Sequence, residues 1–178
     1  MRAKNFLSIR EMAVFSMLGT IMYISKKIME WAPNIHFLGM LIVVTTIVYR
    51  KKALIPIYIY VFLDGLFYGF SMWWMPYLYI WTILWGLAML LPRRMSRTVA
   101  IIVLPTLCAI HGFLFGVLYA PAQAIMFGLD LKATLAWIAA GLPFDLLHGI
   151  GNFASGFLAL PLISLICRLE KKTFPYKK

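Results

Sequence analysis

Charge is scarce in this sequence, and its scarcity excludes most soluble folds. Only 13% of the 178 residues are charged, whereas 63% are hydrophobic and the mean hydropathy is +0.87. A soluble domain of this length is nearer half apolar and about one quarter charged. One core of this size cannot bury so much apolar surface. The composition therefore predicts an integral membrane protein without a soluble domain.

Acidic residues, cysteines and catalytic motifs are scarce as well. The chain has six Asp and Glu residues, and the three histidines fall in different apolar stretches. It contains no Walker A, HExxH, paired-cysteine or GxSxG motif. Cys108 and Cys167 are expected to be reduced packing residues. We therefore expect no enzymatic activity, no ATP hydrolysis by the chain itself, and no metal or cofactor.

Long apolar stretches are what the sequence does have. A membrane-spanning helix needs about 20 mostly apolar residues. The last stretch is too long for one straight span and continues past Pro143. The sequence predicts an all-α integral membrane protein with six transmembrane helices, forming one domain over residues 1–178. The predicted helices cover approximately residues 9–31, 36–49, 53–71, 75–92, 99–127 and 131–168.

Basic residues alternate between the two sides of this predicted arrangement. A net charge of +11 would also suit a nucleic-acid partner, but the basic residues form short runs between apolar stretches. We therefore expect a lipid bilayer and no nucleic acid. The positive-inside rule places both termini and the even-numbered connectors in the cytoplasm. The residues assigned to that side are Arg2, Lys4, Arg10, Arg50, Lys51, Lys52, Arg93, Arg94, Arg97, Arg168, Lys171, Lys172, Lys177 and Lys178, and those on the other side are Lys26, Lys27 and Lys132.

The last apolar stretch carries a polar face. Asp145, His148 and Asn152 are spaced i, i+3 and i+7, so they share one side of a helix. Polar groups within lipid are costly and need partners. Two interpretations are open: a ligand site or polar cavity, and hydrogen bonding between helices beside small residues. An acid–base pair of Asp145 and His148 in a membrane enzyme is a third.

Two further polar residues have both a structural and a functional interpretation. Asp64 is flanked by Tyr60 and Tyr68 at i−4 and i+4, and a tyrosine hydroxyl can stabilise a buried carboxylate. Asn34 precedes the second apolar stretch and is expected to act as its N-cap. A ligand contact is the alternative for each.

Small residues recur at helical spacing in two stretches. Gly112 and Gly116 form a GxxxG pattern that lets helices approach closely. Ala13, Ser16 and Thr20 form a small-residue stripe on the first stretch. This stripe either packs within the protein or docks a separate membrane partner.

The chain resembles the substrate-binding S components of energy-coupling factor (ECF) transporters. The resemblance is carried by PNIHFLGMLIVV at 33–44, YRKKALIPIYIYVFLDGLFYGFSMWWMPYLYIW at 49–81 and GLPFDLLHGIGNF at 141–153. These stretches are most similar to the hydroxymethylpyrimidine- or pyridoxine-type branch, and pantothenate-type members are the alternative. The family's AxxxA docking motif is altered here, because Ala13 is followed four residues later by Met17.

The resemblance implies a function and a set of residues. It implies a subunit of the bacterial cytoplasmic membrane that captures a water-soluble vitamin or precursor on its outer face. Delivery inward would need a transmembrane coupling protein, the T component, and two ATPase subunits, docked through Ala13, Ser16 and Thr20. A purely structural assembly subunit is the competing interpretation. The substrate-binding residues implied by the family are His36, Trp73, Trp74, Tyr77, Trp81, Gln123, Asp145, His148 and Asn152.

Overall fold

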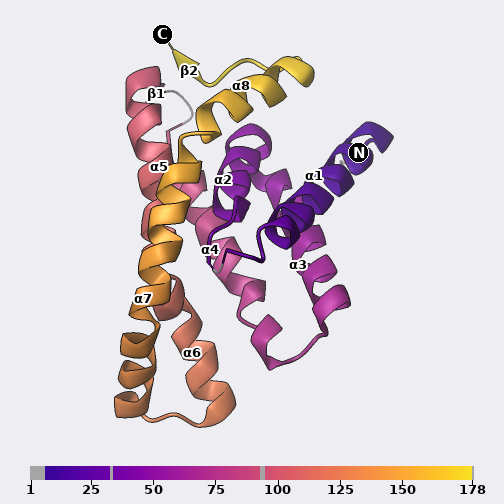
Figure 1. Cartoon of the computed structure of the whole chain (residues 1–178). Coiled ribbons are helices and arrows are strands. Elements are labelled where there is room, and N and C mark those ends of the chain that lie inside the picture. Colours follow the sequence, from indigo (N-terminus) through magenta and orange to yellow (C-terminus); the bar gives the residue numbers. More distant parts are fainter. Residues whose placement is uncertain (1–6, 33, 93–94, 178) are drawn as a thin grey trace, which may run out of the picture.

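Among the described residues, the regular elements are helices and one pair of two-residue strands (Figure 1). The computed structural model describes residues 7–32, 34–92 and 95–177. Strand β1 (Met95–Ser96) pairs in parallel with β2 (Tyr176–Lys177). The predicted all-α class is confirmed. The helices are α1 (Ile9–Ile28), α2 (Leu38–Tyr49), η1 (Arg50–Ala53), α3 (Leu54–Tyr68), η2 (Met72–Trp74), α4 (Tyr77–Leu90), α5 (Arg97–Phe113), α6 (Phe115–Phe127), α7 (Leu131–Gly156) and α8 (Ala159–Leu169).

The six predicted apolar stretches correspond to these helices, except that the fifth and the sixth stretch each hold two α-helices. Each of the first four stretches contains one α-helix, from α1 to α4. The fifth divides at Leu114 into α5 and α6, and the sixth divides at residues 157–158 into α7 and α8. Pro143 lies inside α7 and does not end it. Helix α8 leaves the line of α7 and runs across the upper end of the molecule in Figure 1.

Among the described residues, two helices are long and apolar enough to cross a membrane: Arg97–Phe127, which joins α5 and α6, and α7. Only 39% and 17% of their most apolar windows are buried inside the fold. The core helix of a soluble protein would bury most of such a window. Outward-facing side chains such as Phe144, Leu146 and Ile150 are instead more than half exposed. Their apolar surface suits contact with lipid.

Side-chain caps begin three of the helices. Ser8 accepts a hydrogen bond from the Glu11 amide, and the Glu11 side chain accepts one from the Ser8 amide, which completes a capping box on α1. Ser96 caps α5, and Asp130 caps α7 at 2.7 Å from the Ala133 nitrogen. These residues explain why the helices start where they do.

The predicted capping role of Asn34 is wrong. Helix α2 begins after Phe37, which makes no side-chain capping hydrogen bond. Asn34 lies further out in the α1–α2 connector with a φ of 61°. That left-handed conformation is one that Asn tolerates better than most residues, because its short polar side chain bonds locally. Asn34 therefore turns the connector instead of starting the helix.

Several basic segments lie at one end of the molecule and are joined there by salt bridges. Arg10 of α1 pairs with Glu170 beyond α8 at 3.2 Å, and Lys52 of η1 pairs with Glu11. The β1–β2 pair brings the start of α5 to the same end (Figure 1). Segments that the charge pattern assigns to one side thus lie together. Of the basic residues in that set, Arg2, Lys4, Arg93, Arg94 and Lys178 lie outside the described residues.

Helices α5 and α7 approach each other through glycines. A Cβ atom added to Gly112 would lie 2.9 Å from the Gly149 backbone, and one added to Gly156 would lie 2.5 Å from the Pro105 Cα. Real side chains do not tolerate such distances, so the two backbones are in direct contact. The predicted close approach at Gly112 is confirmed.

Alanine at Gly156 is expected to destabilise the protein by roughly 1–3 kcal/mol, because the added methyl group meets the Pro105 backbone. Gly141→Ala is the matched control in the same helix, since a Cβ there meets nothing within 4 Å. Because alanine has a higher helix propensity than glycine, Gly141→Ala should leave the stability of the protein unchanged or raise it. Thermal unfolding of both variants in detergent tests this, and equal stability would contradict the packing described.

Candidate functional site

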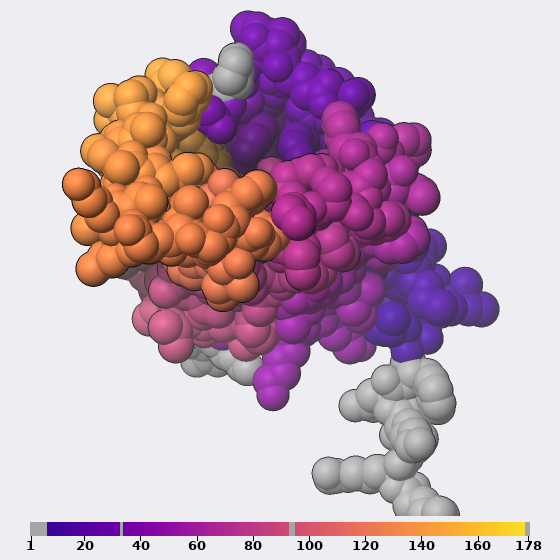
Figure 2. Space-filling model, turned by 90° about the horizontal axis from the view of Figure 1, so that it is seen from below, coloured from indigo at the N-terminus to yellow at the C-terminus, as the bar shows by residue number. Residues whose placement is uncertain are grey.

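A hollow opens at the end of the molecule opposite α8. Figure 2 shows it between the end of α1 with its connector to α2, the α3–α4 connector, and the α6–α7 hairpin. Two cavities share Lys26, Glu30 and Tyr77 here. The outer pocket, of about 310 Å³, is lined by these three residues with Tyr68 and Trp73. The inner pocket, of about 190 Å³, is lined by the three with Met29, Ala32, Asn34, Ile35, His36, Trp81, Phe115 and His148.

Flat rings form the wall of the inner pocket. The His36 and His148 rings lie 4.9 Å apart between centroids, and His148 lies 4.9 Å from Phe115. Trp81 makes edge contacts with Tyr77 at 5.7 Å and with His36 at 6.4 Å. Five rings from the α1–α2 connector, α4, α6 and α7 therefore surround one small space. Such a wall suits a flat ligand ring.

Polar atoms of the same rings lack partners within the protein. His36 Nδ1, His148 Nε2 and Trp81 Nε1 are buried and make no hydrogen bond to any described residue. A buried polar group without a partner costs about 1–3 kcal/mol. The indole N–H is a donor, and each imidazole nitrogen donates or accepts according to its tautomer. Three residues that line the inner pocket thus each carry a hydrogen-bonding atom without a partner in the described part of the chain.

Lys26, which lines both pockets, forms an ion pair with Asp64. Both carboxylate oxygens of Asp64, which is fully buried, accept hydrogen bonds from the Lys26 ammonium at 2.9 and 2.7 Å. The ammonium also lies 5.1 Å from the centre of the Tyr77 ring, within cation–π range. An ammonium has three N–H donors, so one remains beyond the two bonds to Asp64, on a residue that lines both pockets.

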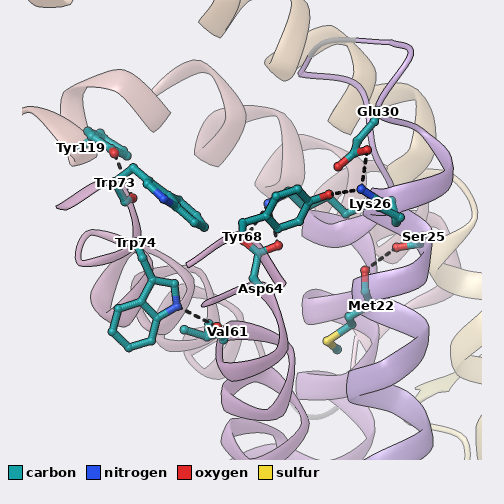
Figure 3. A network of polar contacts seen from close by, with 11 residues as sticks. Met22, Ser25, Lys26, Glu30, Val61, Asp64, Tyr68, Trp73, Trp74 and Tyr119 are labelled. Carbon is teal, nitrogen blue, oxygen red and sulfur yellow. Dashed lines mark hydrogen bonds and ion pairs between the residues drawn. The ribbon is translucent and has the colours of Figure 1, made fainter. Parts of the chain in front are cut away.

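The outer pocket is bounded by the Trp73 and Tyr68 rings, which meet edge to face at 6.3 Å. Figure 3 shows the Trp73 ring turned toward Tyr68, while Trp74 points away to the Val61 carbonyl. The Trp73 carbonyl accepts a hydrogen bond from the Tyr119 hydroxyl at 2.9 Å, which ties α6 to this connector. Trp73 therefore faces the pocket, whereas Trp74 holds the α3–α4 connector on α3.

The polar face of α7 is divided between pocket and helix interface. His148 lines the inner pocket, but Asp145 accepts hydrogen bonds from the Gly116 amide at 3.0 and 3.1 Å. Asn152 lies against Gly39 and Gly112, and its amide is buried without a partner among the described residues. Both interpretations of this face thus find support at different residues: ligand contact at His148 and bonding between helices at Asp145.

The fold brings together most, but not all, of the predicted ligand residues. His36, Trp73, Tyr77, Trp81 and His148 line the two pockets. Residues Gln123, Trp74, Asp145 and Asn152 line neither pocket. The predicted docking residues Ala13, Ser16 and Thr20 are all exposed on one face of α1.

Sequence reasoning missed several pocket residues, Lys26 and Phe115 among them. Lys26 was assigned only to the charge pattern, although a carboxylate such as Asp64 in an apolar helix requires a nearby cation. That requirement was a usable signal. Phe115 carried no signal, because an apolar residue in an apolar stretch is indistinguishable from its neighbours. Tyr68, one of the two tyrosines predicted to flank and stabilise Asp64, bonds elsewhere. Its hydroxyl accepts a hydrogen bond from Lys27 at 2.8 Å.

Comparisons with known proteins identify no relative. No family model matches the chain, no curated protein matches it, and no solved structure matches it. Across residues 7–32, 34–92 and 95–177, no three His, Cys, Asp or Glu side chains gather in a way that could hold a metal ion. Function has to be argued from the hollow itself.

Replacing Lys26 by glutamine is expected to lower the free energy of unfolding by roughly 3 kcal/mol or more, because Asp64 would stay buried without its cation. Lys27→Gln is the matched control, since Lys27 pairs with Glu30 on an exposed surface and should change stability by less than about 1 kcal/mol. Chemical unfolding of both purified variants measures the difference. Equal effects would mean that the Lys26–Asp64 pair has no special role in stability.

Proposed function

We propose that the chain is the solute-binding membrane subunit of an importer of the ECF type. In this proposal it spans the bacterial cytoplasmic membrane with six helices, and both termini lie in the cytoplasm. It captures a water-soluble vitamin or precursor from outside, with hydroxymethylpyrimidine or pyridoxine as the first candidates and pantothenate as the alternative. A coupling protein and two ATPase subunits would supply the energy, and the chain itself would perform no catalysis.

One observation carries the proposal: three residues that line a pocket walled by rings each carry a buried polar atom that bonds to no described residue. Their desolvation is a cost to the protein alone. A ligand that reaches His36, Trp81 and His148 with its own donors and acceptors recovers that cost. The arrangement is typical of a binding site, in which apolar walls surround a few convergent polar groups.

Pocket size limits the class of ligand. Cavities for drug-sized ligands measure roughly 300–1,000 Å³. The inner pocket of about 190 Å³ is below that range, and the outer pocket of about 310 Å³ is at its lower end. A single substituted pyrimidine or pyridine ring suits this space better than a three-ring flavin. An acceptor on that ring would meet the remaining N–H of Lys26.

The charge distribution supports the proposed orientation. The described basic residues of the termini and of η1 gather at the end with α8, whereas the hollow opens at the other end. Basic segments flanking membrane helices favour the cytoplasm. That orientation would direct the hollow to the outside, where a solute has to be captured.

The uncovered face of α1 supports a partner in the membrane. Ala13, Ser16 and Thr20 are exposed, while Phe15, Gly19 and Met22 on the opposite face are buried. Small side chains let another helix approach closely within lipid. The stripe therefore does not serve packing within this chain, and a coupling protein is the occupant that the proposal assigns to it.

The two competing functions have less support. A membrane enzyme using Asp145 and His148 would need the two groups to act together, but the described contacts of Asp145 are with the Gly116 amide. An assembly subunit without a ligand would leave the unpartnered atoms of the inner pocket without a purpose. A solute-binding role accounts for both the pocket and the exposed α1 stripe.

The first expected outcome is stabilisation of the purified protein by one solute. A thermal-shift screen would cover pyridoxine, hydroxymethylpyrimidine, pantothenate, thiamine, riboflavin and niacin. A ligand at 100 times its Kd stabilises the folded state by about 2.7 kcal/mol. We expect a single-ring compound to give the largest shift. A folded protein that responds to none of them would argue for the assembly role.

Loss of the His148 imidazole is expected to weaken binding of that solute by about tenfold or more, because one pocket hydrogen bond disappears. Gln123→Ala is the comparison, since Gln123 lines neither pocket and its removal should change the Kd by less than about twofold. Titration calorimetry of His148→Ala and Gln123→Ala measures both. A larger loss of affinity in Gln123→Ala than in His148→Ala would place the binding site nearer α6.

Tryptophan at Ala13 or Thr20 is expected to abolish co-purification with the coupling protein and ATPases, because the bulky ring blocks helix approach. Solute binding by the isolated subunit should be unchanged, since these residues line neither pocket. Phe62→Trp, on the exposed surface of α3, serves as the control. Intact complexes with both α1 variants would show that the partner docks elsewhere.

A further inference from the structure

A third cavity, of about 560 Å³, lies at the basic end of the molecule, away from the hollow. It is formed by the start of α5, by the α7–α8 junction with α8, and by the segment that leads to β2. Arg97, Arg168 and Ser164 contribute its polar half. Its lining therefore has a different character from that of the ring-walled inner pocket.

Both guanidinium groups in this cavity carry uncompensated charge. Arg97 and Arg168 are exposed, and neither side chain makes a hydrogen bond or ion pair with another described residue. Arg10 and Lys52 at the same end, in contrast, are paired with Glu170 and Glu11. Two cations beside one cavity repel each other unless an anion joins them. Planar guanidinium groups bind phosphate oxygens in pairs, with good geometry.

The other half of the cavity is apolar and outward-facing. Ile101 is 43% exposed, Leu165 48% and Phe157 50%. Helix α8 buries Leu160, Ile163 and Cys167 and leaves Leu165 and Arg168 outside, as an amphipathic helix at a membrane surface does.

We infer that this cavity binds an anionic phospholipid of the leaflet at the basic end. The phosphate lies between Arg97 and Arg168, with the Ser164 hydroxyl as a further donor. An acyl chain follows the outward face formed by Ile101, Phe157 and Leu165. Basic pockets between helices on the cytoplasmic side attract such headgroups. The apolar half distinguishes this assignment from a site for free phosphate, which would use the arginines alone.

Lipid binding here requires only that the chain lies in a membrane, and it does not depend on solute transport. The test is native mass spectrometry of the full chain released from nanodiscs that contain phosphatidylcholine and phosphatidylglycerol in equal amounts. The wild-type protein is expected to retain phosphatidylglycerol preferentially. Arg97→Gln with Arg168→Gln should weaken that retention by about tenfold or more, since each basic contact contributes to headgroup binding.

The control removes the same charge elsewhere at the same end. Lys51→Gln with Lys171→Gln changes two exposed lysines that do not line the cavity, and retention should stay within about twofold of the wild type. Leu165→Trp keeps both arginines and fills the apolar half, so it should also reduce retention. This variant keeps the test decisive if the double arginine variant does not fold.

Three outcomes would overturn the inference. Equal losses in the arginine and lysine variants would mean that surface charge alone attracts the lipid. Undiminished retention in both the arginine variant and Leu165→Trp would place the lipid elsewhere. Thermal stabilisation by millimolar inorganic phosphate equal to that by phosphatidylglycerol, and lost in the arginine variant, would assign the cavity to free phosphate.

Discussion

The direct contact between the backbones of α5 and α7 is the constraint on which the rest of the arrangement depends. Gly112 faces Gly149, and Gly156 faces the backbone of Pro105, so the two backbones meet at these points. In an apolar surrounding, helices gain little from hiding apolar surface and depend on close packing and on hydrogen bonds. This contact sets the rotation of α7, and the rotation decides which of its polar residues faces which neighbour.

That rotation divides one polar stripe into two roles. Asp145 meets the amide of Gly116, which is unpaired within its helix because α6 begins anew after Leu114. The same rotation turns His148 toward His36 and Phe115 and so closes the inner pocket. The break between α5 and α6 thus has two effects: it leaves the Gly116 amide free to bind Asp145, and it brings Phe115 to the inner pocket. Structure and site depend on the same local geometry.

The two ends of the molecule differ in how their charged side chains are paired. At the hollow, the Lys26 ammonium is neutralised by Asp64 and surrounded by tyrosine rings, so the site is polar without a net charge. At the opposite end, the Arg97 and Arg168 side chains pair with no described residue and lie beside a half-apolar cavity. A neutral, ring-lined pocket suits a small solute, and an unpaired basic cavity suits an anionic lipid headgroup. The asymmetry agrees with a protein whose two sides face different surroundings.

The sequence by itself determined the helical class, the approximate helix positions and the close approach at Gly112. These depend on composition, on periodicity and on residues near one another in the chain, which local physics relates to structure. Only the tertiary structure decided which polar residues meet. Asp64 finds its partner 38 residues away at Lys26, and Asp145 finds Gly116 29 residues away. Such pairings depend on how helices are rotated and bent against each other, and no local pattern in the chain encodes that rotation.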